Sequence, residues 1–168
     1  GFEIYVDNDE KGQNLFQELM DKGVDLNVRA GCPNAIERME GGLLSYGNDM
    51  TIKDNVLECG FGGLVSFSDE IDYLAKDHLK QLSLKGIKKS LTGIKIFSDA
   101  FTLLNHEPIF VNGDKVGELR SVVYSPSFKC CLGIAMIDLE TQDNKQKQIA
   151  VIDNNEYQIE ICPLPFNQ

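Results

Sequence analysis

The sequence predicts a mixed α+β or α/β segment followed by an all-β segment. Residues 2–6 alternate between apolar and polar side chains as a half-buried strand does, and a helical pattern follows over residues 10–22. A second alternating stretch at residues 26–30 and a helical pattern at 33–44 complete the order strand, helix, strand, helix. From residue 87 onward, short extended runs are separated by turn residues, which is typical of a small β-barrel.

The change of pattern also predicts where the chain divides. A last helix is expected over about residues 70–83, with Asp69 as its cap and Lys85-Gly86 at its end. We therefore expect one domain over residues 1–84 and a second over residues 85–168. Asn112-Gly113 predicts a hairpin in the second domain. The other strands are expected at 91–97, 116–124, 131–139, 147–152 and 157–162.

Composition and charge exclude several classes of function. A net charge of −10 argues against nucleic acid or an anionic membrane as a partner. No apolar run approaches the roughly 20 residues of a membrane span. The five cysteines are odd in number and form no CxxC pair, which favours reduced, mostly buried thiols and a cytoplasmic location. The chain begins at Gly1 inside an expected strand and without Met, which indicates a fragment or a trimmed domain.

The stretch at residues 32–49 is the most informative. Pro33 suits the first position of a helix, and an apolar stripe runs from Cys32 to Leu43. Gly41-Gly42 then interrupts the helix, which predicts a close approach by backbone or ligand. A core helix with a tight exit explains the same pattern without any ligand.

The string ERMEGGLLSYGND at residues 37–49 resembles the LRLEAG…YGND segment of the tetrahydrofolate-dependent aminomethyltransferase family, the glycine-cleavage T-protein family. With Cys-Pro-Asn before it and LECG at residues 57–60 after it, the string is more similar to the dimethylsulfoniopropionate demethylase branch. GELRSVVYSPSFK at residues 117–129 and PLPF at residues 163–166 resemble motifs of the family's barrel domain.

The resemblance implies a fold, a cofactor and a reaction. The chain would be the end of the family's folate-binding domain followed by its small C-terminal β-barrel domain. Tetrahydrofolate would be the cofactor, with Glu3 holding the pterin ring and Tyr5 lining the pocket where pterin and methyl donor meet. The donor would be dimethylsulfoniopropionate, a sulfonium. The family's catalytic aspartate lies upstream of Gly1, so this chain alone is expected to be inactive.

Two further positions bear on that resemblance. Asn34 stands where the T-protein family has a folate-contacting arginine, and by that resemblance it is a candidate folate contact. Its amide can hydrogen-bond but cannot neutralise a glutamate tail, which weakens the glycine-cleavage assignment. Lys129 matches the family and is a candidate for the folate tail, with a solvated lysine as the plain alternative. His78 and His106 belong to no metal-ligand cluster, so no metal is expected.

Three alternatives stay open beside the demethylase. They are a glycine-cleavage aminomethyltransferase, a non-catalytic folate-binding protein of the same fold, and a merely structural fragment. A homodimer is compatible with the sequence, which does not determine the oligomeric state.

Overall fold

The chain forms two compact units, residues 1–33 and 34–168. The structure, a computed structural model, describes residues 3–29, 31, 34–99, 101, 103, 105–142 and 148–166. Cys32 and Pro33, on which the expected start of the central helix depends, lie outside the described residues. The domain boundary expected near residue 84 falls inside the second unit and remains a prediction.

The first unit contains the expected amphipathic helix, α1 (Asp9–Lys22). The side chain of Asn8 caps it by accepting a hydrogen bond from the backbone N–H of Lys11 at 2.9 Å. Gly23 ends it, with its N–H bonded to the carbonyl of Leu19 at 2.9 Å. No residue of α1 is buried within the described part of the chain.

Neither of the two strands expected in this unit forms in the residues described there, 3–6 and 26–29, so those predictions were wrong. Residues 3–6 are irregular, and Val24–Leu26 is a 3₁₀ helix, η1, rather than the start of a strand. Asn27 follows η1 in the left-handed region, with φ of 55°, and the N–H of Val28 bonds back to the carbonyl of Gly23 at 3.0 Å. An alternating pattern predicts which side chains share a face, but it does not supply a partner strand. In residues 26–28, the backbone N–H groups that strand pairing would need are used in turn hydrogen bonds.

Two helices of the second unit are shorter than expected. The central helix, α2, spans Ala35–Glu40 instead of residues 33–44, because Gly41 caps it and Gly42 has φ of 62°. The helix α3 spans Lys76–Lys85 instead of residues 70–83. Asp69 does not cap α3, since the preceding residue is Ala75 in the left-handed region. Gly86 ends α3 as predicted. A second 3₁₀ helix, η2, spans Gly62–Leu64.

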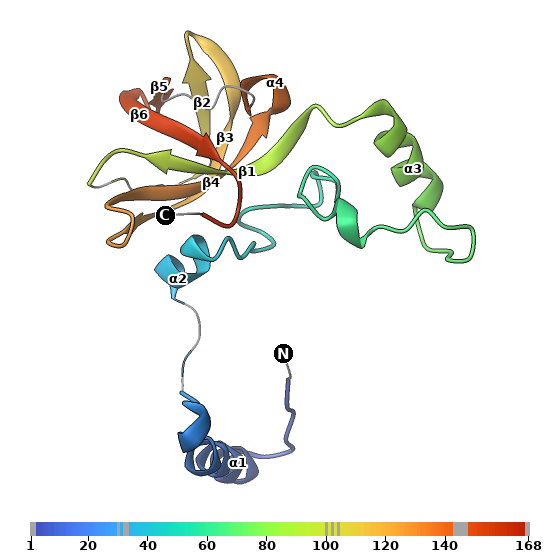
Figure 1. Ribbon diagram of the computed structural model, residues 1–168, viewed down its shortest axis with the longest axis vertical. Helices are drawn as coiled ribbons and strands as arrows, with labels where there is room; N and C mark the ends of the chain where they lie inside the picture. The colour runs from blue at the N-terminus through green and yellow to red at the C-terminus, as the bar shows by residue number, and fades with distance from the viewer. Residues whose placement is uncertain are drawn as a thin grey trace. The chain divides into compact units, whose positions relative to one another are not determined.

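The second unit ends in a closed barrel of six antiparallel strands, which confirms the predicted β-barrel (Figure 1). The order around the barrel is β1-β4-β3-β2-β5-β6, and β6 pairs back to β1. The predicted hairpin joins β2 to β3, with φ of 53° at Asn112 and 88° at Gly113. A short helix, α4 (Leu139–Gln142), follows β4. The strands are β1 (Lys89–Ile96), β2 (Glu107–Val111), β3 (Asp114–Ser125), β4 (Cys130–Asp138), β5 (Gln148–Ile152) and β6 (Asn155–Cys162).

Two apolar clusters hold this unit together. The barrel interior is filled mainly by branched aliphatic side chains, among them Ile94, Ile109, Leu119 and Ile159, all fully buried. A second cluster lies on the outer wall, where Met39 of α2 packs with Cys130, Leu132, Ile134 and Phe166. This cluster fixes α2 and the C-terminal segment against β4.

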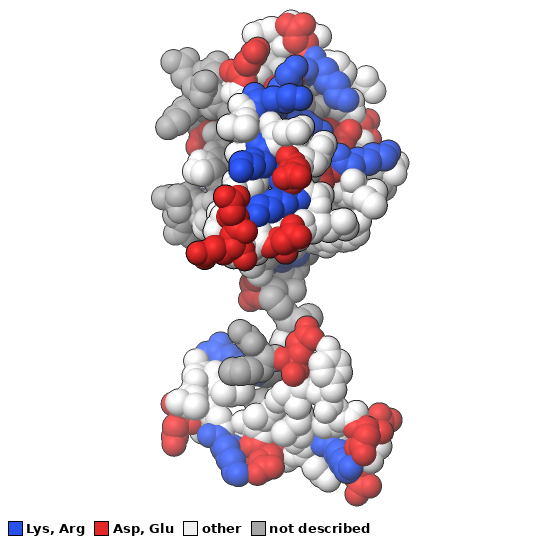
Figure 2. All heavy atoms as spheres, turned by 90° about the vertical axis from the view of Figure 1, so that its right-hand side faces the viewer, with Lys and Arg blue, Asp and Glu red and all other residues white. Residues whose placement is uncertain are grey.

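Charges of both signs are interspersed on the surface. Figure 2 shows Lys and Arg side chains beside Asp and Glu side chains on one face, with no large area of a single sign. Within the described residues, no helix is long and apolar enough to cross a membrane. The same residues contain no group of three or more potential metal ligands.

Candidate functional site

Glu3 and Tyr5 form a hydrogen-bonded pair in the first unit. The Tyr5 hydroxyl donates to Oε2 of Glu3 at 2.5 Å, so the two side chains lie together as the sequence predicts, although no strand holds them there. Both are exposed, Tyr5 by 85%. The hydrogen bond to Glu3, with a smaller contribution from desolvation, raises the pKa of Tyr5 above its usual value. The pair therefore combines a carboxylate acceptor with a free aromatic face.

Asn34 has a structural role that was not among the predictions from the sequence. Its Oδ1 accepts the backbone N–H of Glu37 at 2.9 Å, and Oε2 of Glu37 accepts the backbone N–H of Asn34 at 3.2 Å. This reciprocal capping box begins α2. Because Oδ1 is used in the cap, the amide Nδ2 is the group that Asn34 has left for a ligand.

Lys129 lies in the turn between β3 and β4 with φ of 55°. Its backbone N–H bonds to the carbonyl of Ser125 at 2.8 Å, and its side chain is exposed. The Lys129 ammonium makes no ion pair with the described residues, so it is available to an anion. Lys129 and Asn34 belong to the second unit, and Glu3 and Tyr5 to the first.

A buried carboxylate, Asp49, connects the end of the family motif to the barrel. It is fully buried and accepts hydrogen bonds from Arg38 Nη1 at 2.7 Å, from the N–H of Ser45 at 2.6 Å and from the hydroxyl of Ser121 on β3. We call Arg38, Ser45, Asp49 and Ser121 the Asp49 cluster. Three of its members, Arg38, Ser45 and Asp49, belong to the ERMEGGLLSYGND string, so part of that string is explained by attachment to β3.

A second buried carboxylate, Asp54, binds Arg120 of β3. Burial by itself would raise the pKa of Asp54, but hydrogen bonds from Arg120 and Thr51 outweigh it and lower the pKa to about 2. Arg120 Nε also lies 2.7 Å from Oε1 of Glu118. The pairing satisfies a carboxylate that would otherwise be costly to bury.

Two close approaches complete the attachment of this region to the barrel. The Ser125 hydroxyl donates to Oε1 of Glu40 at 2.5 Å. At Gly42 a Cβ would lie 3.1 Å from Cα of Pro165 and 3.3 Å from Cβ of Leu164. The expected close approach at Gly41-Gly42 is therefore an approach by backbone, and the glycine pair was the signal that indicated it.

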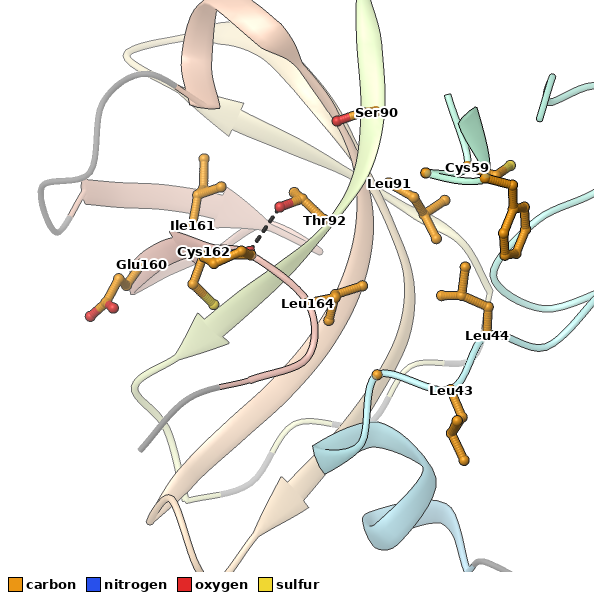
Figure 3. A pocket seen from close by; sticks show the side chains of 14 residues that line it. Leu43, Leu44, Cys59, Ser90, Leu91, Thr92, Glu160, Ile161, Cys162 and Leu164 are labelled. Atoms are coloured by element: carbon orange, nitrogen blue, oxygen red, sulfur yellow. Dashed lines mark hydrogen bonds between the residues drawn. The ribbon is translucent and has the colours of Figure 1, made fainter. Parts of the chain in front are cut away.

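A cavity of about 880 Å³ lies between this region and the barrel wall. Figure 3 shows Leu43 and Leu44 on one side and Leu91, Thr92 and Leu164 on the other. Glu160 brings a carboxylate to the lining, and the hydroxyl of Thr92 donates to the carbonyl of Cys162 at 2.8 Å. None of the four residues expected to bind folate lines this cavity.

The described cysteines are free thiols, as expected. Cys59, Cys130 and Cys131 are buried and Cys162 is half-buried. Burial raises the pKa of each thiol, that of Cys162 to about 11 despite the opposing charge of Lys95. Such thiols are poor nucleophiles at neutral pH.

Comparisons with known proteins agree with this fold. The family model "GCVT N-terminal domain" matches residues 1–69, and "Glycine cleavage T-protein C-terminal barrel domain" matches residues 89–167. A crystal structure of glycine cleavage system aminomethyltransferase T from Bartonella henselae shares the fold, with a TM-score of 0.68 at 18% identity over 77% of this chain and 37% of that one. The chain belongs to the glycine-cleavage T-protein family.

Curated relatives carry two different names. Dimethylsulfoniopropionate demethylase DmdA of Ruegeria pomeroyi is 41% identical over 138 residues, which cover 82% of this chain and 37% of the relative. An aminomethyltransferase of Bacillus cereus is 28% identical over 169 residues, which cover 99% of this chain and 45% of the relative. The chain thus spans less than half the length of either relative.

Proposed function

We propose that the protein carrying this chain transfers a methyl group from dimethylsulfoniopropionate to tetrahydrofolate, giving methylmercaptopropionate and 5-methyltetrahydrofolate. The observation that carries the proposal is the Glu3–Tyr5 pair, which joins a carboxylate to an exposed aromatic ring through a 2.5 Å hydrogen bond. The 41% identity to the Ruegeria pomeroyi demethylase supports the same branch of the family.

Glu3 is the residue that we assign to the pterin ring. Tyr5 takes Oε2, and Oε1 has no donor among the described residues, so one carboxylate oxygen is open to N–H groups of a ligand. A charge-assisted hydrogen bond of this kind is stronger than one between neutral groups. The bond from Tyr5 also restricts the rotamer of Glu3, which lowers the entropy that binding would cost.

Tyr5 is the residue that we assign to the methyl donor. A positively charged sulfur over an aromatic face is stabilised by about 0.5–2 kcal/mol, depending on its desolvation. The ring is 85% exposed, and its hydroxyl is already bonded to Glu3, so its face is free for a cation.

The methyl transfer requires little of the protein beyond aligning the donor with the acceptor. Tetrahydrofolate, when bound, supplies the nitrogen that accepts the methyl group. The lone pair of that nitrogen would form the new bond to the methyl carbon, while the carbon–sulfur bond of the donor breaks with both electrons remaining on sulfur, which leaves as a neutral thioether. The proton of the nitrogen would pass to water. Holding donor and acceptor in line is therefore the main contribution expected of the binding residues. We expect the catalytic residues of the complete protein upstream of Gly1.

Asn34 and Lys129 are proposed contacts for the rest of the folate. The Asn34 side chain has its amide Nδ2 left to donate, and the exposed Lys129 ammonium has no anionic partner among the described residues. An ammonium suits the carboxylates of a folate tail, whereas a neutral amide gives a hydrogen bond without neutralising charge.

The second candidate is a glycine-cleavage aminomethyltransferase, because the Bacillus cereus relative covers 99% of this chain. Asn34 favours the demethylase over this candidate. Its short side-chain oxygen makes the cap of α2, which an arginine has no acceptor to make.

Tetrahydrofolate affinity in a Glu3→Gln variant of the complete protein tests the assignment. We expect binding weaker by about tenfold or more, since a charge-assisted hydrogen bond becomes a neutral one. Glu10→Gln, a matched change at an exposed position of α1, should leave the affinity unchanged. Equal affinities of the Glu3→Gln variant and the unaltered protein would refute the role of Glu3.

A further inference from the structure

A second hollow of the barrel unit, away from the cavity of Figure 3, contains an arginine with unused donors. It has a volume of about 680 Å³ and is lined by residues of four segments, which are α2, the loop that follows α2, the loop before β2, and β3. We call it the β3 groove. Its polar lining residues are Arg38, Asn48, Asn105, His106, Arg120 and Ser121.

We propose that the β3 groove binds the carboxylate of a short aliphatic acid, with Arg38 as the principal contact. This inference does not depend on the folate assignment, because the groove includes none of Glu3, Tyr5, Asn34 and Lys129.

Arg38 is held rigidly by one of its terminal nitrogens. Nη1 donates both to Oδ2 of Asp49 at 2.7 Å and to the carbonyl of Leu43 at 2.8 Å. Nε and Nη2 have no hydrogen-bond partner among the described residues, and 24% of the side chain remains exposed. A guanidinium fixed in this way presents its other edge as two parallel donors, the geometry that binds a carboxylate bidentately.

The other basic side chains around the groove already have partners. Arg120 binds Asp54 and lies beside Glu118, and its side chain is only 9% exposed. His106 Nε2 lies 2.9 Å from the carbonyl of Asn48, and Nδ1 lies 3.5 Å from Oε1 of Glu118. Among the described residues, Arg38 is therefore the cation of the groove that keeps unused donors, Nε and Nη2.

The rest of the lining determines the size and character of the ligand. Leu103 and Val122 supply apolar surface, and Asn105 adds an exposed amide. Apolar walls beside a single carboxylate-binding edge suit a ligand with one carboxylate and a short alkyl body.

Titration of the isotopically labelled chain with butyrate, followed by NMR, tests the proposal. Butyramide and n-butylamine have the same number of carbon atoms but no carboxylate. We expect saturable shifts at groove residues with butyrate and not with the two analogues. Equal shifts with butyrate and butyramide would overturn the proposal.

Two variants distinguish a loss of butyrate binding in the groove from a loss of folding. Arg38→Lys keeps a cation beside Asp49 but loses the fork, and we expect butyrate binding to weaken about tenfold. Asn105→Asp adds a carboxylate to the groove at an exposed position and should abolish binding. The control is Asn112→Asp in the exposed β2–β3 turn, which should leave binding unchanged. If Arg38→Lys fails to fold, the comparison of Asn105→Asp with Asn112→Asp still tests the proposal. Equal butyrate binding by those two variants would contradict it.

Discussion

Arg120 holds Asp54 through both of its terminal nitrogens, with Nη1 3.0 Å from Oδ2 and Nη2 3.2 Å from Oδ1. The two residues are 66 positions apart in the chain, one in an irregular loop and the other on β3. The loop is thereby fixed to the barrel by a planar, bidentate pair with a carboxylate that is only 1% exposed.

We expect Asp54→Asn to lower the free energy of unfolding by about 3 kcal/mol, because the arginine would lose the charge that compensates it in a buried position. Urea unfolding followed by circular dichroism measures the change. Asp153→Asn, at an exposed position in the β5–β6 turn, is the matched control and should shift stability by less than about 0.5 kcal/mol. Similar midpoints for the two variants would mean that the pair does not stabilise the loop.

The same carboxylate makes stability depend on acidity. The pKa of Asp54 is about 2 in the folded chain against an ordinary 3.8. A carboxyl group with a lowered folded pKa stabilises the fold above its unfolded pKa and loses that contribution as the pH falls through the folded value. We expect about 2 kcal/mol to be lost between about pH 5 and about pH 2. The Asp54→Asn variant should lack this part of the loss. If its unfolding free energy depended on pH in the same way as that of the unaltered chain, Asp54 would not be the source of the effect.

Gly42→Ala should destabilise the chain by about 2 kcal/mol. The residue has φ of 62°, and the added methyl group would meet the backbone of Pro165 at 3.1 Å. Gly63→Ala is a suitable control, since nothing lies within 4 Å of the Cβ position there. Thermal unfolding of the two variants gives the comparison, and an equal loss in both would show that the approach of Pro165 is not tight.

Cys162 should resist alkylation although it is half-buried rather than buried. Desolvation raises the pKa of its thiol to about 11, so little thiolate exists near neutral pH. Labelling with iodoacetamide at about pH 8, read by peptide mass spectrometry, should be about 100-fold slower than in urea-unfolded chain. A comparable rate in the two states would indicate an accessible, ordinary thiol.

Local signals predicted much of the barrel. Asn112-Gly113 marks the β2–β3 hairpin because two consecutive residues with positive φ are needed in such a turn. Alternation failed in the first unit, because residues 3–6 and 27–29 carry the pattern without a partner strand. Pairing is a property of two segments, and a single segment does not encode it.

In the candidate site, too, contacts between neighbours in the sequence were predictable and contacts between distant segments were not. Glu3 and Tyr5 were predictable as neighbours because they are two positions apart and hydrogen-bond directly. The contacts of Asp49 with Ser121 and of Asp54 with Arg120 span more than 60 positions, so no local pattern revealed them. Asn34 was interpreted as a folate contact in the place of an arginine, although a capping box with Glu37 could also have been recognised from the spacing Asn-x-x-Glu.

The most direct test of the proposed function is to identify the folate product formed by the complete protein. Tetrahydrofolate would be incubated with dimethylsulfoniopropionate in one reaction and with aminomethylated H-protein in another, and the folates separated by mass. We expect 5-methyltetrahydrofolate from the first reaction and no one-carbon folate from the second. Methylenetetrahydrofolate from the second reaction alone would contradict the demethylase assignment and establish the aminomethyltransferase instead.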